Sequence, residues 1–254
     1  MRLRARTVVT ALAVAASLAI PLTACGPNSP SPDPDGSPTT TPSPTPTILP
    51  DVLVERALKI TLDAPSKRII GSAAAGGHGV EFDVTFAGQN AKGTKISTAP
   101  GISTTIEFIR VGEDLFINAD EHYWQSHYNL EVLKYLVHKW VRVDADDPNY
   151  TDLLVIQAND EVQPVGGITQ TGTDTVNGQP VVVLKDSEGH TFYVATEGEP
   201  YLLKFEGSQA SPVGLATVTI TFSEFGTASG TIAAPTGPIF DPLHDFPEIA
   251  VGRD

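Results

Sequence analysis

Cysteine is almost missing from this chain of 254 residues, which contains Cys25 alone. A single thiol has no partner within the chain, so an intramolecular disulfide is excluded. Secreted domains often use disulfides to support a small core. Without that crosslink, the stability of this fold has to come from the packing of apolar side chains.

Basic residues and long apolar runs are also scarce. The chain has 16 Lys and Arg against 30 Asp and Glu, which gives a formal net charge of −14 at pH 7. This excess of acid argues against nucleic acid as a partner, because nucleic-acid binding depends on basic patches. It also argues against attachment to anionic headgroups by charge. The apolar stretch 8–20 is shorter than the ~20 residues of a membrane-spanning helix, and no other run approaches that length.

The N-terminus has the parts of a secretory signal peptide over residues 1–24. Three arginines precede the apolar stretch 8–20, and LTAC follows at 22–25. This last sequence resembles the lipobox of bacterial lipoproteins. The resemblance implies that the chain is cut before Cys25, whose sulfur carries a diacylglyceryl group, often beside a further acyl chain such as palmitate. The alternative is an ordinary cleavage site with a cysteine beside it. Removal of residues 1–24 leaves 13 basic and 30 acidic residues, a net charge of −17.

Residues 25–50 are predicted to be a disordered tether. Nine of the 21 prolines lie within 26–50, mixed with Ser, Thr, Asp and Gly. Such a segment cannot bury enough apolar surface to order itself, and its X-Pro repeats favour extended polyproline II at ~3.1 Å per residue. The tether would therefore hold the rest of the chain up to ~80 Å from a membrane. Its composition resembles that of tethers in actinobacterial lipoproteins.

Residues 51–230 are predicted to form one domain. Asp51 is placed to cap a helix over 52–60, with Leu53, Ala57 and Ile60 on one face. Beyond it, alternation of apolar and polar residues predicts strands, several of them separated by turn sequences such as VNGQ at 176–179. The predicted strands span residues 80–86, 102–110, 115–118, 140–143, 179–185, 190–195, 201–206 and 216–225.

Two further helices and an irregular tail complete the prediction. Apolar residues recur at helical spacing within 121–139, and a second helix is predicted over 152–159. Residues 231–254 contain four prolines and are expected to be irregular. Short turns between consecutive strands imply antiparallel pairing, and an antiparallel sheet with helices on one face is an α+β fold.

The order of these segments resembles that of actinobacterial lipoproteins of the LppX/LprG type, whose fold is related to that of the lipoprotein carrier LolA. The resemblance is carried by the lipobox at Cys25, the helix at 52–60, EFIRVGEDLFINAD (107–120), Trp124 with a helix, HKWVRV (138–143), VNGQPVVVLKDSEGHTFYVATEGEPYLLKFEG (176–207) and VTITFSEFG (218–226).

The resemblance implies a curved antiparallel half-barrel sheet with helices packed on its concave face. Between sheet and helices it implies an apolar cavity that holds the acyl chains of a lipid or glycolipid. One departure is the sequence GSAAAGGHG at 71–79, which is small and flexible where a fuller strand is expected.

A cavity of this kind needs more inward-facing apolar side chains than helix packing uses. Period-2 spacing places the candidates of each strand on one face, and each CH₂ of a bound acyl chain would contribute ~0.8 kcal/mol. The alternative is that these residues close-pack against the helix and leave no cavity. The candidate lining residues are Val80, Phe82, Val84, Phe86, Ile106, Phe108, Leu115, Ile117, Leu133, Leu136, Tyr201, Leu203, Phe205, Val218, Ile220 and Phe222.

No pattern in the sequence predicts an enzyme, a metal site or a cofactor. His122 and His127 are five residues apart, not the four of a helical zinc pair. DADDPN at 144–149 hints at a calcium loop, but Asn149 and Val155 stand where such a loop needs Gly and Glu. No G-x-S-x-G nucleophile elbow occurs, and the glycines at 76–79 lack the strand and helix of a nucleotide loop.

The sequence therefore predicts a lipoprotein on the outer face of the cell membrane. Its expected partners are the membrane, through lipidated Cys25, and a lipid or glycolipid that it binds and carries in an apolar cavity. The alternative is a non-enzymatic interaction or sensing module of the cell envelope with a filled core. Both readings fit the acidic composition and the long tether.

Overall fold

The computed structural model describes residues 48–126, 130–146, 150, 162–227, 231–241 and 245. Cys25, nearly all of the predicted tether and the helix predicted over 152–159 lie outside these residues. The described elements are α1 (Pro50–Leu62), β1 (Ser66–Ala75), β2 (His78–Ala87), β3 (Asn90–Ala99), β4 (Ile102–Val111), β5 (Asp114–Ala119), α2 (Glu121–Gln125), α3 (Leu130–Leu136), β6 (Trp140–Asp144), β7 (Thr169–Val176), β8 (Gln179–Lys185), β9 (Thr191–Ala195), β10 (Leu202–Ser211), β11 (Gly214–Ser223) and β12 (Ile239–Phe240).

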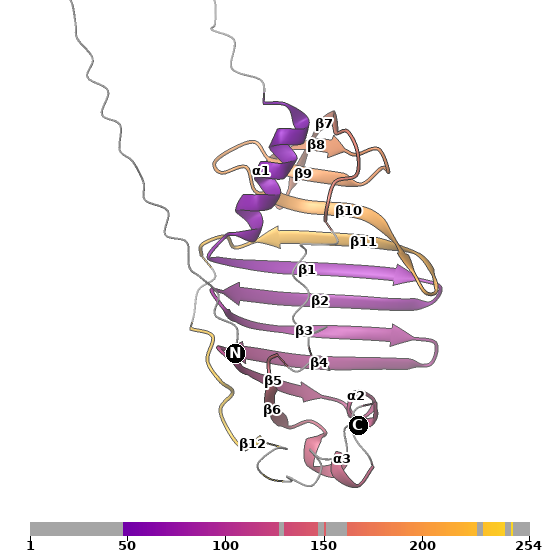
Figure 1. Ribbon diagram of the computed structural model, residues 1–254, viewed down its shortest axis with the longest axis vertical. Helices are drawn as coiled ribbons and strands as arrows, with labels where there is room; N and C mark the ends of the chain where they lie inside the picture. Colours follow the sequence, from indigo (N-terminus) through magenta and orange to yellow (C-terminus); the bar gives the residue numbers. More distant parts are fainter. Residues whose placement is uncertain are drawn as a thin grey trace, which may run out of the picture. The chain divides into compact units, whose positions relative to one another are not determined.

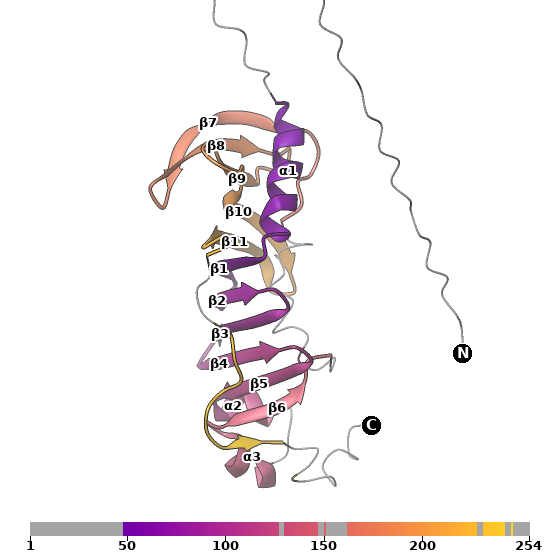
Figure 2. The same ribbon diagram turned by 90° about the vertical axis from the view of Figure 1, so that its left-hand side faces the viewer.

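The strands of the described residues form one open, twelve-stranded sheet (Figure 1). Their order is β12-β6-β5-β4-β3-β2-β1-β11-β10-β9-β8-β7. Neighbouring strands pair antiparallel, except for β12, which runs parallel to β6. Seen along its edge, the sheet bends, with β7 turning away from the line of the central strands (Figure 2). The predicted α+β class, a curved antiparallel sheet with few helices, is confirmed.

Strong alternation located strands reliably, but β1, β3 and β7 lie outside the predicted strands. Every strand predicted from alternation is present, and the predicted turn at 176–179 has Asn177 and Gly178 at positive φ, as a tight hairpin turn requires. The segment 71–79, small and flexible in sequence, contains the end of β1, the turn at 76–77 and the start of β2. Residues 71–75 complete β1, which pairs along its length with both β2 and β11. Hydrogen bonding to two neighbours outweighs the low strand propensity of Gly and Ala.

Helix α1 confirms the prediction at 52–60, but not the role given to Asp51. Leu49 occupies the N-cap without a side-chain hydrogen bond, and Pro50 opens the first turn, where its missing N–H costs nothing. The Asp51 carboxylate instead accepts a hydrogen bond of 2.8 Å from the backbone N of Ile168. The buried face of α1 is Val54, Ala57, Leu58 and Thr61, so Leu53 and Ile60 lie beside this face rather than at its centre.

The single helix expected within 121–139 is two shorter helices, α2 and α3. The Asp120 side chain caps α2 by accepting a hydrogen bond of 3.0 Å from the backbone N of Tyr123, which fixes where that helix begins. A turn connects α3 to β6, and His138 in this turn has a positive φ. β12 also corrects the expectation of an irregular tail, since Ile239 and Phe240 pair with β6.

The two faces of the sheet differ in polarity. Directly paired residues on neighbouring strands share a face, and the pairs Ile69–Phe222, Ile69–Val84 and Phe108–Ile117 place apolar side chains together. We call this side the apolar face. On the other side, the polar face, Arg68 donates from Nε and Nη2 to the two carboxylate oxygens of Asp83, at 2.8 and 2.6 Å. The hydrogen bond from Arg68 holds the pKa of Asp83 below its ordinary value.

Two hydrophobic clusters cover the apolar face. The first joins α2 and α3 to β4, β5 and β6, around Trp124, Phe108 and Leu136. The second joins α1 to β8, β9, β10 and β11, around Leu58 and Phe192. Both clusters use the same side of the sheet, so the helices lie on one face, as an α+β sheet of this kind requires. No helix within the described residues is long and apolar enough to cross a membrane.

Candidate functional site

The candidate site is the middle of the apolar face, where the two clusters meet. Phe82 and Phe86 of β2 are half-buried, and each packs against both clusters. Helix α1 contacts β7, β9 and β10, and α2 contacts β4. Figure 1 accordingly shows the described helices towards the two ends of the sheet, with β1, β2 and β3 between them. A largely apolar surface therefore crosses strands that the described helices leave partly open, and Lys95 of β3, which pairs with Phe82 and Ile106, is a charged residue on the same face.

A groove of about 390 Å³ extends this surface along β1 and β2. Its floor belongs to the apolar face, because Ala73 pairs with Val80, Val80 with Ser97, and Ser97 with Thr104. The volume lies within the ~300–1,000 Å³ typical of small-molecule sites. The lining residues are Ala73, Ala74, Ala75, His78, Gly79, Val80, Ser97, Thr98, Ala99, Ile102, Thr104, Ser211, Val213 and Ala216.

The groove exists because its residues are small. Ala73, Ala75, Ala99 and Ala216 stand at positions where the central part of the sheet carries Phe or Ile on the same face. A side chain that ends at Cβ leaves the space above the backbone open, whereas a large one would fill it. The segment 71–79, which departs from a typical strand sequence, is therefore the segment that shapes the groove.

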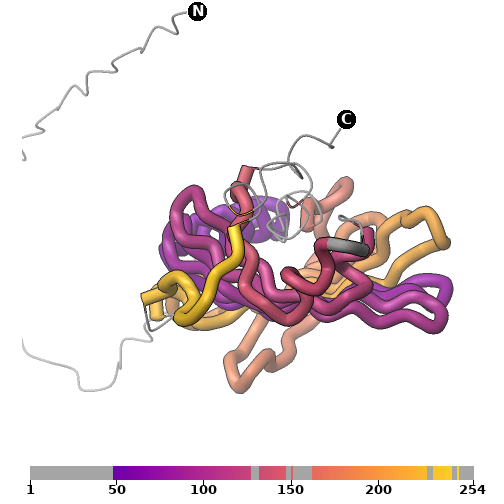
Figure 3. Tube along the Cα trace, turned by 90° about the horizontal axis from the view of Figure 1, so that it is seen from below, coloured from indigo at the N-terminus to yellow at the C-terminus, as the bar shows by residue number. Residues whose placement is uncertain are grey.

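The groove lies at the end of the sheet where three hairpins turn. The turns at residues 76–77, 100–101 and 212–213 join β1 to β2, β3 to β4 and β10 to β11. These strands are neighbours, and Figure 3 shows their hairpins projecting at the same end. We call this end the hairpin end. A Cβ at Gly76 would lie 2.8 Å from the carbonyl O of Val213, and one at Gly77 3.8 Å from Pro100, so the turn at 76–77 lies beside each of the other two.

Most residues predicted to line a cavity lie on the apolar face or in the helix against it. Phe82 and Phe86 join the clusters, and Val80 lies in the groove. The other predicted residues found in the two clusters are Val84, Ile106, Phe108, Leu115, Ile117, Leu133, Leu136, Phe205, Val218, Ile220 and Phe222.

Tyr201 and Leu203 are the exceptions. A β-bulge between Leu202 and Lys204 shifts the pairing of β10 with β9, and one extra residue reverses the side to which the following side chains point. Leu202 therefore lies with the apolar-face cluster, while Tyr201 and Leu203 pack in a third cluster with Val181. The expectation that they share a face with Phe205 is wrong, because period-2 spacing cannot anticipate a bulge.

The sequence interpretation missed the small residues of the groove. The predicted lining residues were large and apolar. The groove instead depends on small side chains that leave space above the backbone, those of Ala73, Ser97, Ala99 and Ala216. A signal was present, since 71–79 was singled out as unusually small. Its meaning depends on which strands lie beside it, and β11, which pairs with β1, comes from a distant part of the chain.

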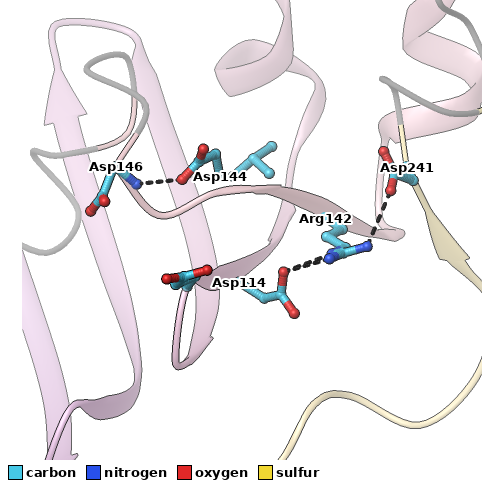
Figure 4. Close-up of a pocket in the computed structure, with 7 residues that line it drawn as sticks. Asp114, Arg142, Asp144, Asp146 and Asp241 are labelled. Carbon is cyan, nitrogen blue, oxygen red and sulfur yellow. Dashed lines mark hydrogen bonds and ion pairs between the residues drawn. The ribbon is translucent and has the colours of Figure 1, made fainter. Parts of the chain in front are cut away.

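A second pocket, of about 680 Å³, is polar (Figure 4). It includes Glu113 and Asp114 at the turn between β4 and β5, which is at the other end of β4 from the hairpin end. Arg142 occupies its centre and donates from Nε to Asp114 at 2.8 Å and from Nη1 to Asp241 at 3.4 Å. Asp144 accepts a hydrogen bond from the backbone N of Asp146, as in a local turn. The cationic guanidinium thus already balances carboxylates that would otherwise attract a cation. Part of the weak calcium sequence, 147–149, lies outside the described residues.

The part of the chain that the structure describes contains a His–Asp pair but no cluster of metal ligands. There, no three His, Cys, Asp or Glu side chains come together in a way that could hold a metal ion. His190 pairs with the buried Asp186, its Nδ1 at 2.8 Å from the carboxylate and its Nε2 at 3.1 Å from the carbonyl O of Ser208. Asp186 also accepts backbone hydrogen bonds from Val165 and Glu188. This pair organises the loop between β8 and β9.

Comparison with known proteins gives structural likenesses only. No family model matches the chain, and no curated protein matches it. Similar solved structures include LprF from Mycobacterium bovis, with 16% identity and a TM-score of 0.48 over 73% of this chain and 96% of that one. They also include the lipoprotein LppX from Mycobacterium tuberculosis, with 13% identity and a TM-score of 0.42 over 71% and 96%. MucB follows, with 13% identity and a TM-score of 0.37 over 74% and 63%. LprF and LppX are of the type that the order of segments resembles.

Proposed function

We propose that this protein is a lipoprotein, lipid-anchored on the outer face of the cell membrane, that binds the acyl chains of a lipid or glycolipid. The binding site is the middle of the apolar face together with the groove. Its centre is Phe82 and Phe86, and its small-residue end is formed by Ala73, Ala99 and Ala216. No catalytic step is part of the proposal.

The observation that carries the proposal is the largely apolar surface at the middle of the apolar face, where Lys95 is the charged neighbour of Phe82. Two helix-covered clusters meet at half-buried Phe82 and Phe86, and the surface continues into a groove of about 390 Å³. A largely apolar surface that the described helices leave partly open is a mark of a binding site. The polar face, by contrast, is lined by ion pairs such as Arg68 with Asp83.

The energetics suit a ligand with a long hydrocarbon chain. Each CH₂ taken out of water contributes ~0.8 kcal/mol, so a chain of several methylenes can bind without a specific polar contact. Apolar walls with few polar groups also explain why the sequence contains no recognisable binding motif. Phe82 and Phe86 provide large flat surfaces for such a chain.

Uptake of a fluorescent fatty acid and a fluorescent phospholipid tests the proposal. The protein is the mature chain, residues 25–254, with Cys25→Ser, so that neither its own acyl anchor nor the apolar stretch 8–20 can occupy the site. We expect saturable binding, and native mass spectrometry should detect co-purifying lipid masses that disappear after organic extraction. A chain that shows no saturable uptake, and a mass unchanged by incubation with envelope lipids, would overturn the proposal in favour of an interaction module with a filled core.

A further inference from the structure

Charge is distributed unevenly along the strands. Residues 69–80, 96–106 and 207–223 contain no Asp, Glu, Lys or Arg, although charged residues make up 18% of the chain. These three runs contain the three turns of the hairpin end. The opposite end of the strands carries Glu113, Asp114, Arg142 and Asp144 around the polar pocket. The three runs that form the hairpin end therefore carry no charged side chains, although the protein as a whole is acidic.

The same end exposes apolar side chains. Ile102 begins β4, Val213 lies in the turn between β10 and β11, and Leu215 follows it in β11. Their exposed fractions are 49%, 45% and 70%. Two of them, Ile102 and Val213, also line the groove, and Leu215 lies two residues beyond Val213 at the same hairpin.

We infer that the hairpin end docks on a lipid bilayer, with Ile102, Val213 and Leu215 inserted at the boundary between headgroups and acyl chains. Exposed apolar side chains on a neutral surface gain free energy by entering this boundary. The acidic remainder of the protein would be repelled by an anionic surface, so an uncharged end is the part that can approach a membrane most closely. In this orientation the groove opens towards the acyl chains.

The tether is compatible with this orientation. If Cys25 is lipidated, the residues up to Pro50 reach up to ~80 Å when extended, which leaves the sheet free to turn its hairpin end to the membrane. The inference deepens the proposed function, because the groove would then exchange lipid directly with the bilayer. Docking itself needs only the three exposed side chains, so the two proposals can fail separately.

The test is flotation with phosphatidylcholine vesicles, using the mature chain, residues 25–254, with Cys25→Ser, so that neither the apolar stretch 8–20 nor an acyl anchor binds the vesicles. The double variant Val213→Asp/Leu215→Asp places charge at the hairpin end, and Val52→Asp is the matched control, because Val52 is 51% exposed on α1. We expect the partition coefficient of the double variant to fall about tenfold or more, and that of Val52→Asp to stay unchanged. Added phosphatidylserine should weaken binding at low salt, since like charges repel within a Debye length.

Three outcomes overturn docking. The first is that the parent protein fails to float, and the second is that the double variant floats as well as the parent. The third is that the parent forms a dimer, which Val213→Asp/Leu215→Asp dissociates, while neither protein binds vesicles. In the last case, the surface would be an interface between two copies. Thermal melts confirm that the double variant is folded. Uptake of free fatty acid, measured without vesicles, reports on the proposed function alone, so loss of uptake with retained flotation would refute lipid binding but leave docking in place.

Discussion

The aromatic ring of Phe82 lies over the backbone of Gly71, its directly paired neighbour on β1. A Cβ at Gly71 would overlap the ring at Cζ. The pair therefore works as one unit, in which the missing side chain of glycine makes room for phenylalanine. Because Phe82 packs against both hydrophobic clusters, this unit connects the two parts of the apolar face.

Substitution of Gly71 by alanine should push the Phe82 ring out of its place. Overpacking of this kind costs ~1–3 kcal/mol in the free energy of unfolding, which urea denaturation can measure. The free energy of unfolding of the double variant Gly71→Ala/Phe82→Leu should fall by less than the sum of the decreases in the two single variants, because leucine is too short to overlap a Cβ at position 71. Ser72→Ala, on the opposite face of the same strand, is the control and should have little effect. Additive losses would show that the two residues do not interact.

Filling the groove should reduce lipid uptake without reducing stability. Thr104 lines the groove, whereas its neighbour Ser103 is exposed and points to the other face. Thr104→Trp should therefore weaken the uptake of a fluorescent fatty acid several-fold, and Ser103→Trp should leave it unchanged. Equal uptake by both variants would place the ligand elsewhere. Unfolding curves of the two proteins should be similar, since neither position belongs to a buried cluster.

The hydroxyl of Thr61 should hold α1 to the bulge in β10. Thr61 is fully buried, and its Oγ1 accepts a hydrogen bond of 2.8 Å from the backbone N of Leu202. Thr61→Val keeps the shape but leaves this buried N–H without its acceptor, which costs ~1–3 kcal/mol. Thr61→Ser keeps the hydroxyl and should be the less destabilised of the two in thermal melts. The reverse order would mean that the methyl group, not the hydrogen bond, matters.

Asp186 should make stability depend on pH in the acid range. Burial alone would raise the pKa of Asp186, but hydrogen bonds from the Val165 backbone and from His190 hold the pKa below its ordinary value. A carboxyl group whose pKa is lower in the folded than in the unfolded state stabilises the fold at pH values above the unfolded pKa of ~3.9. This stabilisation is lost as the pH falls through the pKa of the folded state. The contribution should be constant above pH ~5.

Asp186→Asn tests this pH dependence. The variant should be less stable than the parent by ~1–3 kcal/mol near neutral pH, because an amide offers one acceptor oxygen where two are used. The difference should shrink as the pH falls below ~4. The exposed carboxylate variant Glu197→Gln should show no such convergence. A constant difference between the parent and Asp186→Asn down to pH ~2 would contradict the assignment.

Much of the sheet could be predicted from local sequence. Alternation in 80–86 and 216–225 located β2 and β11, and Asn177 with Gly178 located a turn, because these patterns follow from the period of a strand and the φ that a hairpin turn needs. The same alternation identified most of the apolar face. Asp51 was misassigned as a cap, because an acceptor at a helix start can equally bind a distant N–H, here that of Ile168.

The sequence by itself determined that the chain has acidic composition, alternating strands and a charge-free set of turns, since these are properties of neighbouring residues. Only the tertiary structure decided how they combine. It set Tyr201 and Leu203 apart from Phe205 through a bulge, and it placed β1 between β2 and β11. It also gathered Ala73, Ala99 and Ala216 into one groove. Register and adjacency depend on hydrogen bonds between segments far apart in the chain, and no local pattern encodes them.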